Sequence, residues 1–148
     1  MKTEIKSIYA KWFAAVEEFT KGNESFLTFL ETTADTIAAL SNHPGLYIDC
    51  PSLLADEIAA AKQEFAAQSP DVTDPAALDA FLLQRQSRVM GEGTTFKMLL
   101  DLKAYELLAE AEKFGLADED SALYLRCRID RAIDRRLARL NKSAATAG

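Results

Sequence analysis

The residues best suited to covalent chemistry lie close together in the segment 43–50. Cys50 directly precedes Pro51, which fits the first position of a helix, and a helix N-terminus stabilises a thiolate. His43 lies seven residues upstream as a candidate base, and Asp49 could orient its ring. Each residue also has a simpler role, Cys50 as a small buried group and His43 as a loop or capping residue. We keep Cys50 and His43 as a secondary hypothesis of a reactive pair and predict no catalytic residue.

The chain has too few metal-ligating side chains for a transition-metal centre. It contains one histidine and two cysteines, whereas four-cysteine zinc sites, di-iron bundles and HExxH proteases each need more. The acidic residues of 106–112 and 118–120 lack the order of a calcium-binding loop. The glycines of 91–93 lack the order of a phosphate-binding loop. The sequence therefore predicts no metal site and no cofactor, and it disfavours an enzyme.

The most informative charge pattern lies near the C-terminus. Residues 126–142 hold seven basic and two acidic residues, a net charge of +5, whereas the remaining chain carries −11. Five of the basic side chains recur at 3-4-4-3 spacing, which places them on one face of a helix. We name these residues the arginine stripe: Arg128, Arg131, Arg135, Arg139 and Lys142. The stripe is the predicted partner-binding site.

Three interpretations of the arginine stripe are open at this point. The simplest is a solvated face that offsets the acidic remainder of the chain. The functional interpretation that we favour is contact with an acidic protein partner or with a second copy of the chain. Nucleic acid is the alternative, although no aromatic residue lies between Arg126 and Lys142 to stack on unpaired bases.

Composition and periodicity together predict an all-α protein. The chain holds 25 Ala and 19 Leu but only 3 Val, and Ala and Leu are strong helix formers. Apolar residues recur at helical spacing between clear breaks, as in Ile5, Tyr9, Trp12, Val16 and Phe19. Helices are expected at about 3–20, 24–41, 51–67, 75–90, 95–114 and 119–141.

These segments predict a compact single-domain bundle of five or six helices over residues 1–142, followed by a disordered C-terminal tail over 143–148. The bundle is expected to begin with an antiparallel αα-hairpin, because Gly22 can end the first helix and Asn23 can cap the second. Arg85 interrupts the apolar face of the fourth helix. We expect its stem to cover apolar surface while its head reaches water.

Several apolar residues fall outside the main apolar faces. Phe13 and Phe29 lie beside the stripes of the first two helices, which indicates a second buried surface, either another helix or a partner subunit. This observation favours a homodimer. Met98, Leu102 and Tyr105 widen the apolar surface of the fifth helix, and such a helix usually lies near the centre of a bundle.

The longest unbroken apolar run, 12–16, is far too short to span a membrane, and no secretion signal is evident. We therefore expect a cytoplasmic protein with two free thiols and no membrane contact. The expected function is that of a small non-enzymatic interaction or regulatory protein that acts through protein–protein contacts as a homodimer. The alternatives are a nucleic-acid-associated regulator that uses the arginine stripe, and a helical bundle that binds a small ligand near 43–50.

Overall fold

The computed structural model describes residues 2–86 and 95–147. Over this part of the chain it forms six α-helices and no strand, which confirms the predicted all-α bundle. The helices are α1 (Lys2–Thr20), α2 (Phe26–Leu40), α3 (Leu53–Gln68), α4 (Pro75–Gln84), α5 (Phe96–Lys113) and α6 (Glu119–Ala147). The glycines of 91–93 lie outside the described residues.

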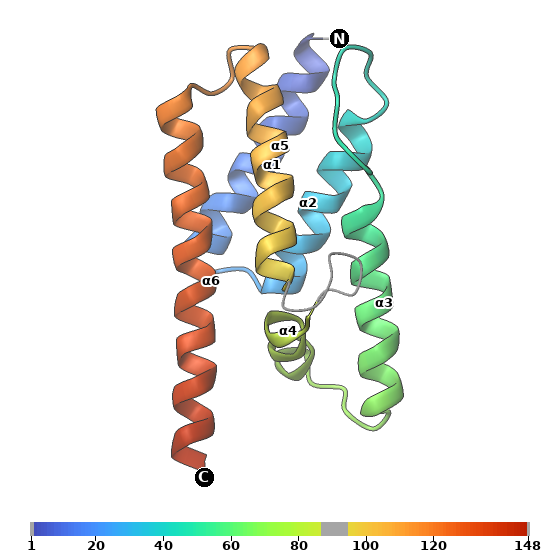
Figure 1. Ribbon diagram of the computed structural model, residues 1–148, viewed down its shortest axis with the longest axis vertical. Coiled ribbons are helices and arrows are strands. Elements are labelled where there is room, and N and C mark those ends of the chain that lie inside the picture. The colour runs from blue at the N-terminus through green and yellow to red at the C-terminus, as the bar shows by residue number, and fades with distance from the viewer. Residues whose placement is uncertain (1, 87–94, 148) are drawn as a thin grey trace.

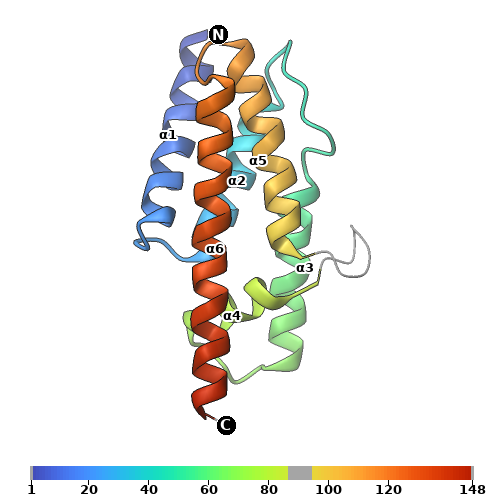
Figure 2. The same cartoon turned by 60° about the vertical axis from the view of Figure 1, so that its left-hand side comes forward.

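The longer helices run side by side along the long axis, and the short helix α4 lies across the lower half of the molecule (Figure 1). α6 packs against α1, α4 and α5. Figure 2 shows α6 in front of the bundle, with α1 on one side and α5 on the other. The C-terminal half of α6 extends well beyond the end of α1, so α6 presents a long outer face (Figure 1).

The expected αα-hairpin forms between α1 and α2, which pack closely together. Gly22 adopts a φ of 86°, and its amide donates to the Phe19 carbonyl while the Asn23 amide donates to the Glu18 carbonyl. This pattern ends α1 as glycine C-caps usually do. The second helix starts later than expected, because Ser25 rather than Asn23 caps it: the Ser25 hydroxyl accepts from the Thr28 amide at 3.1 Å.

Three further helix boundaries differ from the expected ones by two residues or more. α3 starts at Leu53, because Cys50 adopts a left-handed φ of 44° and the next two residues form a turn. α4 ends at Gln84, because Arg85 has an extended backbone with a ψ of 135°. α6 continues to Ala147 rather than ending near 141, and its added residues include alanines, which favour helix. Disorder of 143–148 in solution stays a prediction.

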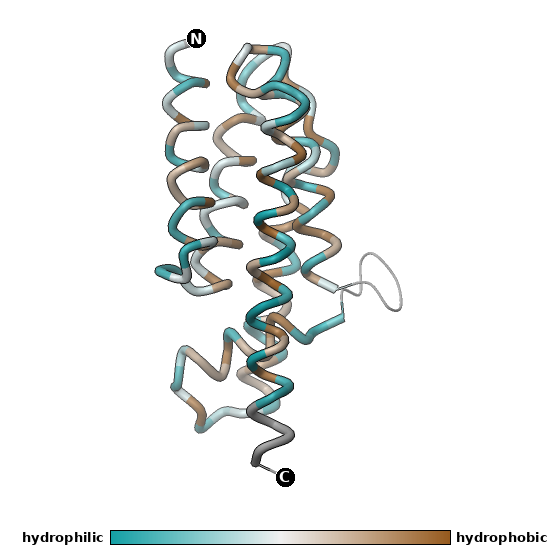
Figure 3. Tube along the Cα trace, turned by 90° about the vertical axis from the view of Figure 1, so that its left-hand side faces the viewer, coloured by the Kyte–Doolittle hydropathy of each residue, from teal (hydrophilic) through white to brown (hydrophobic). Residues whose placement is uncertain are grey.

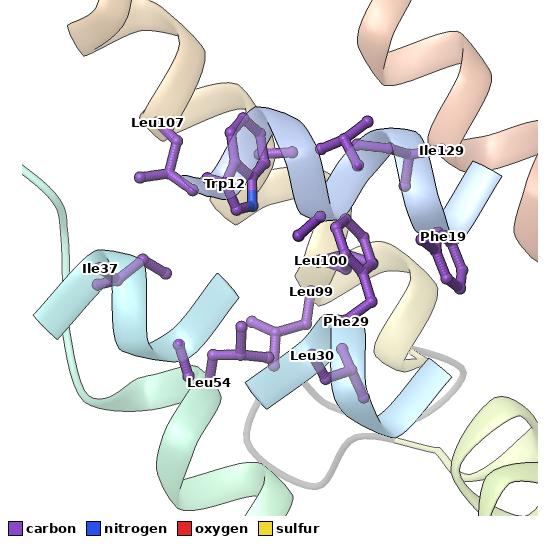
Figure 4. Close-up of a cluster of buried hydrophobic side chains, with 14 of the residues drawn as sticks. Trp12, Phe19, Phe29, Leu30, Ile37, Leu54, Leu99, Leu100, Leu107 and Ile129 are labelled. Carbon is purple, nitrogen blue, oxygen red and sulfur yellow. The ribbon is translucent and has the colours of Figure 1, made fainter. Parts of the chain in front are cut away.

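The core is built from large side chains of every helix that meet between α1, α2 and α5 (Figure 4). Trp12 is fully buried, and its indole nitrogen donates to the Thr33 hydroxyl at 3.1 Å. Phe29 is also fully buried and stacks on Phe19 with ring centroids 4.4 Å apart. Phe13 packs beside Trp12 at 5.8 Å. Packing within one chain thus accounts for both aromatic residues that fall outside the main stripes.

Teal and brown segments alternate down the length of α6 in Figure 3, as expected for an amphipathic helix that covers the bundle with one face. Ile129, Ala132 and Ile133 of α6 are buried. Among the described residues, no helix is both long enough and apolar enough to cross a membrane.

Candidate interaction surface

The structure divides the arginine stripe into residues that hold the fold and residues that face outward. Arg128 donates to the Glu17 carboxylate at 3.1 Å and to the Thr20 hydroxyl at 2.7 Å. Arg135 donates to the Thr20 carbonyl at 3.1 Å. Both therefore neutralise the C-terminal end of α1, where the helix dipole is negative. Arg135 is nevertheless exposed, as are the other three members, Arg131, Arg139 and Lys142.

Arg136, which the sequence analysis left out of the stripe, makes several contacts with α1 and with the segment that joins it to α2. It donates to the carbonyls of Phe19, at 3.2 Å, and Glu24, at 2.6 Å, and its guanidinium lies 4.2 Å above the Phe19 ring. Burial lowers the pKa of Arg136, and the nearby carboxylate of Asp79, at 3.9 Å, opposes that shift. Its spacing of seven residues from Ile129 places it on the buried face, a signal that the sequence already contained.

Asp79 of α4 works together with Arg136 at the corner between α1 and α2. Its two carboxylate oxygens accept from the Phe26 amide at 3.1 Å and from the Leu27 amide at 2.8 Å. These are the first amides of α2 and lack partners within the helix. The arginine and the aspartate also line a shallow hollow of about 270 Å³ with Gly22, Ala80 and Arg139. At this corner, Asp79 and Arg136 therefore connect α1, α2, α4 and α6.

Arg85 does not reach water, contrary to the expectation from its place on α4. Its side chain is 4 % exposed and donates to Glu57 and Glu64 of α3, both at 2.9 Å. Burial alone would lower the pKa of Arg85, but the hydrogen bonds from Arg85 to Glu57 and Glu64 raise it. The buried carboxylates explain why an arginine interrupts an apolar face, since a buried cation requires paired anions.

Cys50 and His43 make their contacts with different partners. His43 lies 3.8 Å from the Glu4 carboxylate of α1. Cys50 is exposed, and its thiol lies 3.8 Å from the Asp49 carboxylate. The Asp49 carbonyl in turn accepts from Lys103, a buried residue of α5. The structure therefore uses this segment to hold the loop before α3 against α5, and it does not bring Cys50 and His43 together. Within residues 2–86 and 95–147, no cluster of His, Cys, Asp and Glu could hold a metal.

The fifth helix is not fully surrounded, contrary to the expectation that it lies at the centre. One of its faces is exposed, with Met98 at 56 %, Leu102 at 37 % and Tyr105 at 55 %. Leu123 of α6, 58 % exposed, lies across a groove of about 210 Å³ that Tyr105 also lines. We name Met98, Leu102, Tyr105 and Leu123 the α5–α6 face. The 4-3 spacing of Met98, Leu102 and Tyr105 predicted that these residues share one face of α5. Whether that face is exposed depends on where the other helices pack.

Ion pairs across the two helices bound the α5–α6 face. Arg126 of α6 bonds to both carboxylate oxygens of Asp101, at 3.3 and 3.2 Å, and its guanidinium lies 5.0 Å from the Tyr105 ring. Lower on the same side, Lys97 of α5 contacts Asp134 at 2.6 Å. Asp130 lies near these charges, and its pKa is raised by partial burial and by Asp101, with Lys97 opposing the shift. The seam is therefore held by paired charges while its apolar residues face outward.

Comparisons with known proteins give no relative from which a role could be transferred. No family model matches the chain, and neither curated proteins nor solved structures include a match. Among the described residues, the α5–α6 face and the exposed residues of the arginine stripe are the candidate interaction surfaces that we consider.

Proposed function

We propose that this chain is a non-enzymatic interaction protein and that the α5–α6 face is the surface through which it binds another protein. The observation that carries the proposal is the exposure of Met98, Leu102 and Tyr105 on one face of α5, next to a groove that Tyr105 lines together with Leu123 of α6. Exposed apolar residues are ordinary when scattered, but a group that adjoins a groove is typical of an interface. Methionine and tyrosine are also enriched in interface cores.

The arginine stripe gives less direct support to the proposal of a binding partner. Two of its members, Arg128 and Arg135, already contact the end of α1, so their donors are partly used within the chain. A role in nucleic-acid binding stays a prediction that rests on Arg131, Arg139 and Lys142. Binding of duplex or single-stranded DNA that weakens steeply with added salt, and that is lost in Arg131→Glu/Arg139→Glu, would establish it.

Site-specific photo-cross-linking in the cells that make the protein tests the proposed function. A photoreactive phenylalanine derivative replaces Leu102, which lies on the α5–α6 face. The matched control carries it at Val72, which is 43 % exposed and lies between α3 and α4. We expect a discrete protein adduct from position 102 and none from position 72.

The mass of the adduct also identifies the kind of partner. An adduct of twice the chain mass would show the homodimer that the sequence analysis predicts, and another mass would show a different protein. Equal labelling from both positions, or no adduct from position 102, would refute the α5–α6 face as a docking surface.

A further inference from the structure

The shape of the α5–α6 face fits a helix better than an extended strand or a flat partner. α5 and α6 lie side by side and run antiparallel (Figure 2). The groove between them lies at one end of the pair, where Tyr105 and Glu112 of α5 line it together with Leu123 of α6. Met98 and Leu102 precede Tyr105 on successive turns of α5 and continue the exposed apolar face beyond the groove. A third helix lying in such a groove would present its own apolar residues at spacings of three and four.

Acidic residues outnumber basic residues around the groove. The seam between α5 and α6, at one end of which the groove lies, carries two basic residues, Lys97 and Arg126, both of which are already paired with aspartates. It carries five acidic residues: Asp101, Glu112, Glu119, Asp130 and Asp134. Glu112 and Glu119 line the groove itself and are exposed, and no ion pair is described for either among the residues of the structure. A ligand in this groove therefore meets an excess of negative charge.

We infer that the α5–α6 face binds an amphipathic helix of another protein, with apolar residues toward the groove and basic residues beside them. The inference rests on the proposed function and specifies its partner class. Basic side chains at the end of the groove would pair with Glu112 and Glu119, which have room to accept them. Apolar residues of the ligand would cover Leu102, Tyr105 and Leu123.

The same charges argue against a second copy of this chain in the groove. Two α5–α6 faces brought together would place five acidic residues from each copy in one interface against two bases from each. Like charges in an interface oppose association, and they select against the wrong partner. A helix with Lys or Arg beside its apolar stripe removes this repulsion.

Two synthetic peptides of about 16 residues test the charge class of the partner. Both carry leucines at 4-3-4 spacing in an alanine–glutamine background, and they differ only in having Lys or Glu beside the leucines. Binding to the full chain is measured by calorimetry, and amide chemical shifts locate the site. We expect the Lys peptide to bind at least about fivefold more tightly than the Glu peptide at low salt, with shifts on α5 and α6.

Variants of the chain separate the apolar and charged contributions. In Glu112→Lys/Glu119→Lys, the preference should reverse toward the Glu peptide, and Leu102→Asp should abolish binding of both peptides. Val72→Asp is the control and should bind like the parent chain. Circular dichroism and thermal unfolding show whether each variant is folded, so a loss of binding can be assigned to the surface.

The outcomes distinguish the two proposals. Equal affinity for both peptides, no binding of either, or shifts confined to other helices would refute a basic helical partner. If position 102 nevertheless gives a protein adduct in cells, the docking surface stands and only its partner class is wrong. If the Lys peptide binds but position 102 gives no adduct, the groove has the inferred selectivity and the proposed function fails.

Discussion

Arg85 shows how a single buried cation joins three elements of this fold. It follows α4, pairs with Glu57 and Glu64 of α3, and lies 5.7 Å from the Phe96 ring at the start of α5. Arg85→Ala would leave the buried carboxylate of Glu57 without this partner, which should lower the free energy of unfolding by about 3–5 kcal/mol. Urea unfolding followed by the fluorescence of Trp12, the single tryptophan, measures the change.

The control for Arg85 is Arg126, whose ion pair with Asp101 is partly exposed. Arg126→Ala should cost less than about 1 kcal/mol, because solvent screens such a pair. A double variant, Arg85→Met/Glu57→Gln, should recover part of the loss by removing one buried charge with its partner. If Arg85→Ala costs no more than Arg126→Ala, the buried ion pairs contribute little to stability.

Tyr9 gives the fold a specific sensitivity to alkaline pH. Its hydroxyl donates to the Leu107 carbonyl at 2.5 Å, and burial, with a contribution from Glu110, raises its pKa far above the ordinary 10.0. The unfolded chain loses this proton at lower pH than the folded protein does. The free energy of unfolding should therefore fall as pH rises above about 10.

Ultraviolet titration of tyrosine tests the role of Tyr9. One phenol should ionise only as the protein unfolds, and that step should be missing in Tyr9→Phe. At neutral pH the same variant should lose about 1 kcal/mol, because the Leu107 carbonyl loses its donor. A phenol that ionises in step with the others, without unfolding, would contradict the buried hydrogen bond.

The limits of the sequence at the residue scale follow from the distances that separate partners along the chain. Helical spacing placed Arg85 on the apolar side of the predicted fourth helix, but α4 ends one residue before it, and its anions lie on α3, more than 20 residues earlier. Arg136 likewise bonds to the carbonyls of Phe19 and Glu24 across the whole bundle. Local periodicity shows which other residues lie on the same face of a helix as a charged residue. It does not show which side chain from another element meets it.

At the scale of elements, α4 acts as a cap for α2. Asp79→Ala should lower the free energy of unfolding by about 1–2 kcal/mol and accelerate hydrogen exchange of the Phe26 and Leu27 amides, because both lose their acceptor. Asp35→Ala, on an exposed position of α2, is the control and should change neither quantity appreciably. Unchanged exchange at Phe26 and Leu27 in Asp79→Ala would show that this cap does not form.

Helix positions were predictable where local signals set them. Gly22 ended α1 as expected, and Asp74 with Pro75 began α4, where the Asp74 carboxylate accepts from the Ala76 amide at 3.0 Å. The end of α4 was not predictable in the same way. The Arg85 side chain bonds to α3, and at Arg85 the backbone leaves the helix, although the sequence pattern continues as helix toward 90.

At the scale of the whole molecule, two surfaces carry opposite charge, and this predicts how copies of the chain interact. The outer side of α6 is basic and the α5–α6 face is acidic, within a chain of net charge −6. Sedimentation velocity at low ionic strength should show a monomer, and any contact between two α5–α6 faces should strengthen as salt screens their repulsion. An oligomer that dissociates with salt and is lost in Arg131→Glu/Arg139→Glu would contradict this expectation. It would instead show the arginine stripe of one copy on the acidic face of another.

The all-α bundle could be predicted because composition and periodicity apply to the whole chain. The position of the candidate surface could not be predicted from the sequence. Met98, Leu102 and Tyr105 have the same helical spacing as the core residues of α5, and only the positions of the other helices leave one set exposed. Phe29 shows the reverse: its position predicted a second buried surface formed by another helix or a partner subunit, and the structure buries it against Phe19 of α1.

The corner between α1 and α2 also determines when the first helical pair can be completed during synthesis. Asp79 emerges from the ribosome some 50 residues after the amides that it caps, and Arg136 emerges 112 residues after Glu24. Until then, α1 and α2 can meet through their apolar faces, but the turn between them lacks the carboxylate of Asp79 and the guanidinium of Arg136. A nascent chain stalled before α6, or a fragment cut within it, would therefore carry a loosely closed N-terminal hairpin that proteases could enter at 21–25. The last helix to be made secures the first turn.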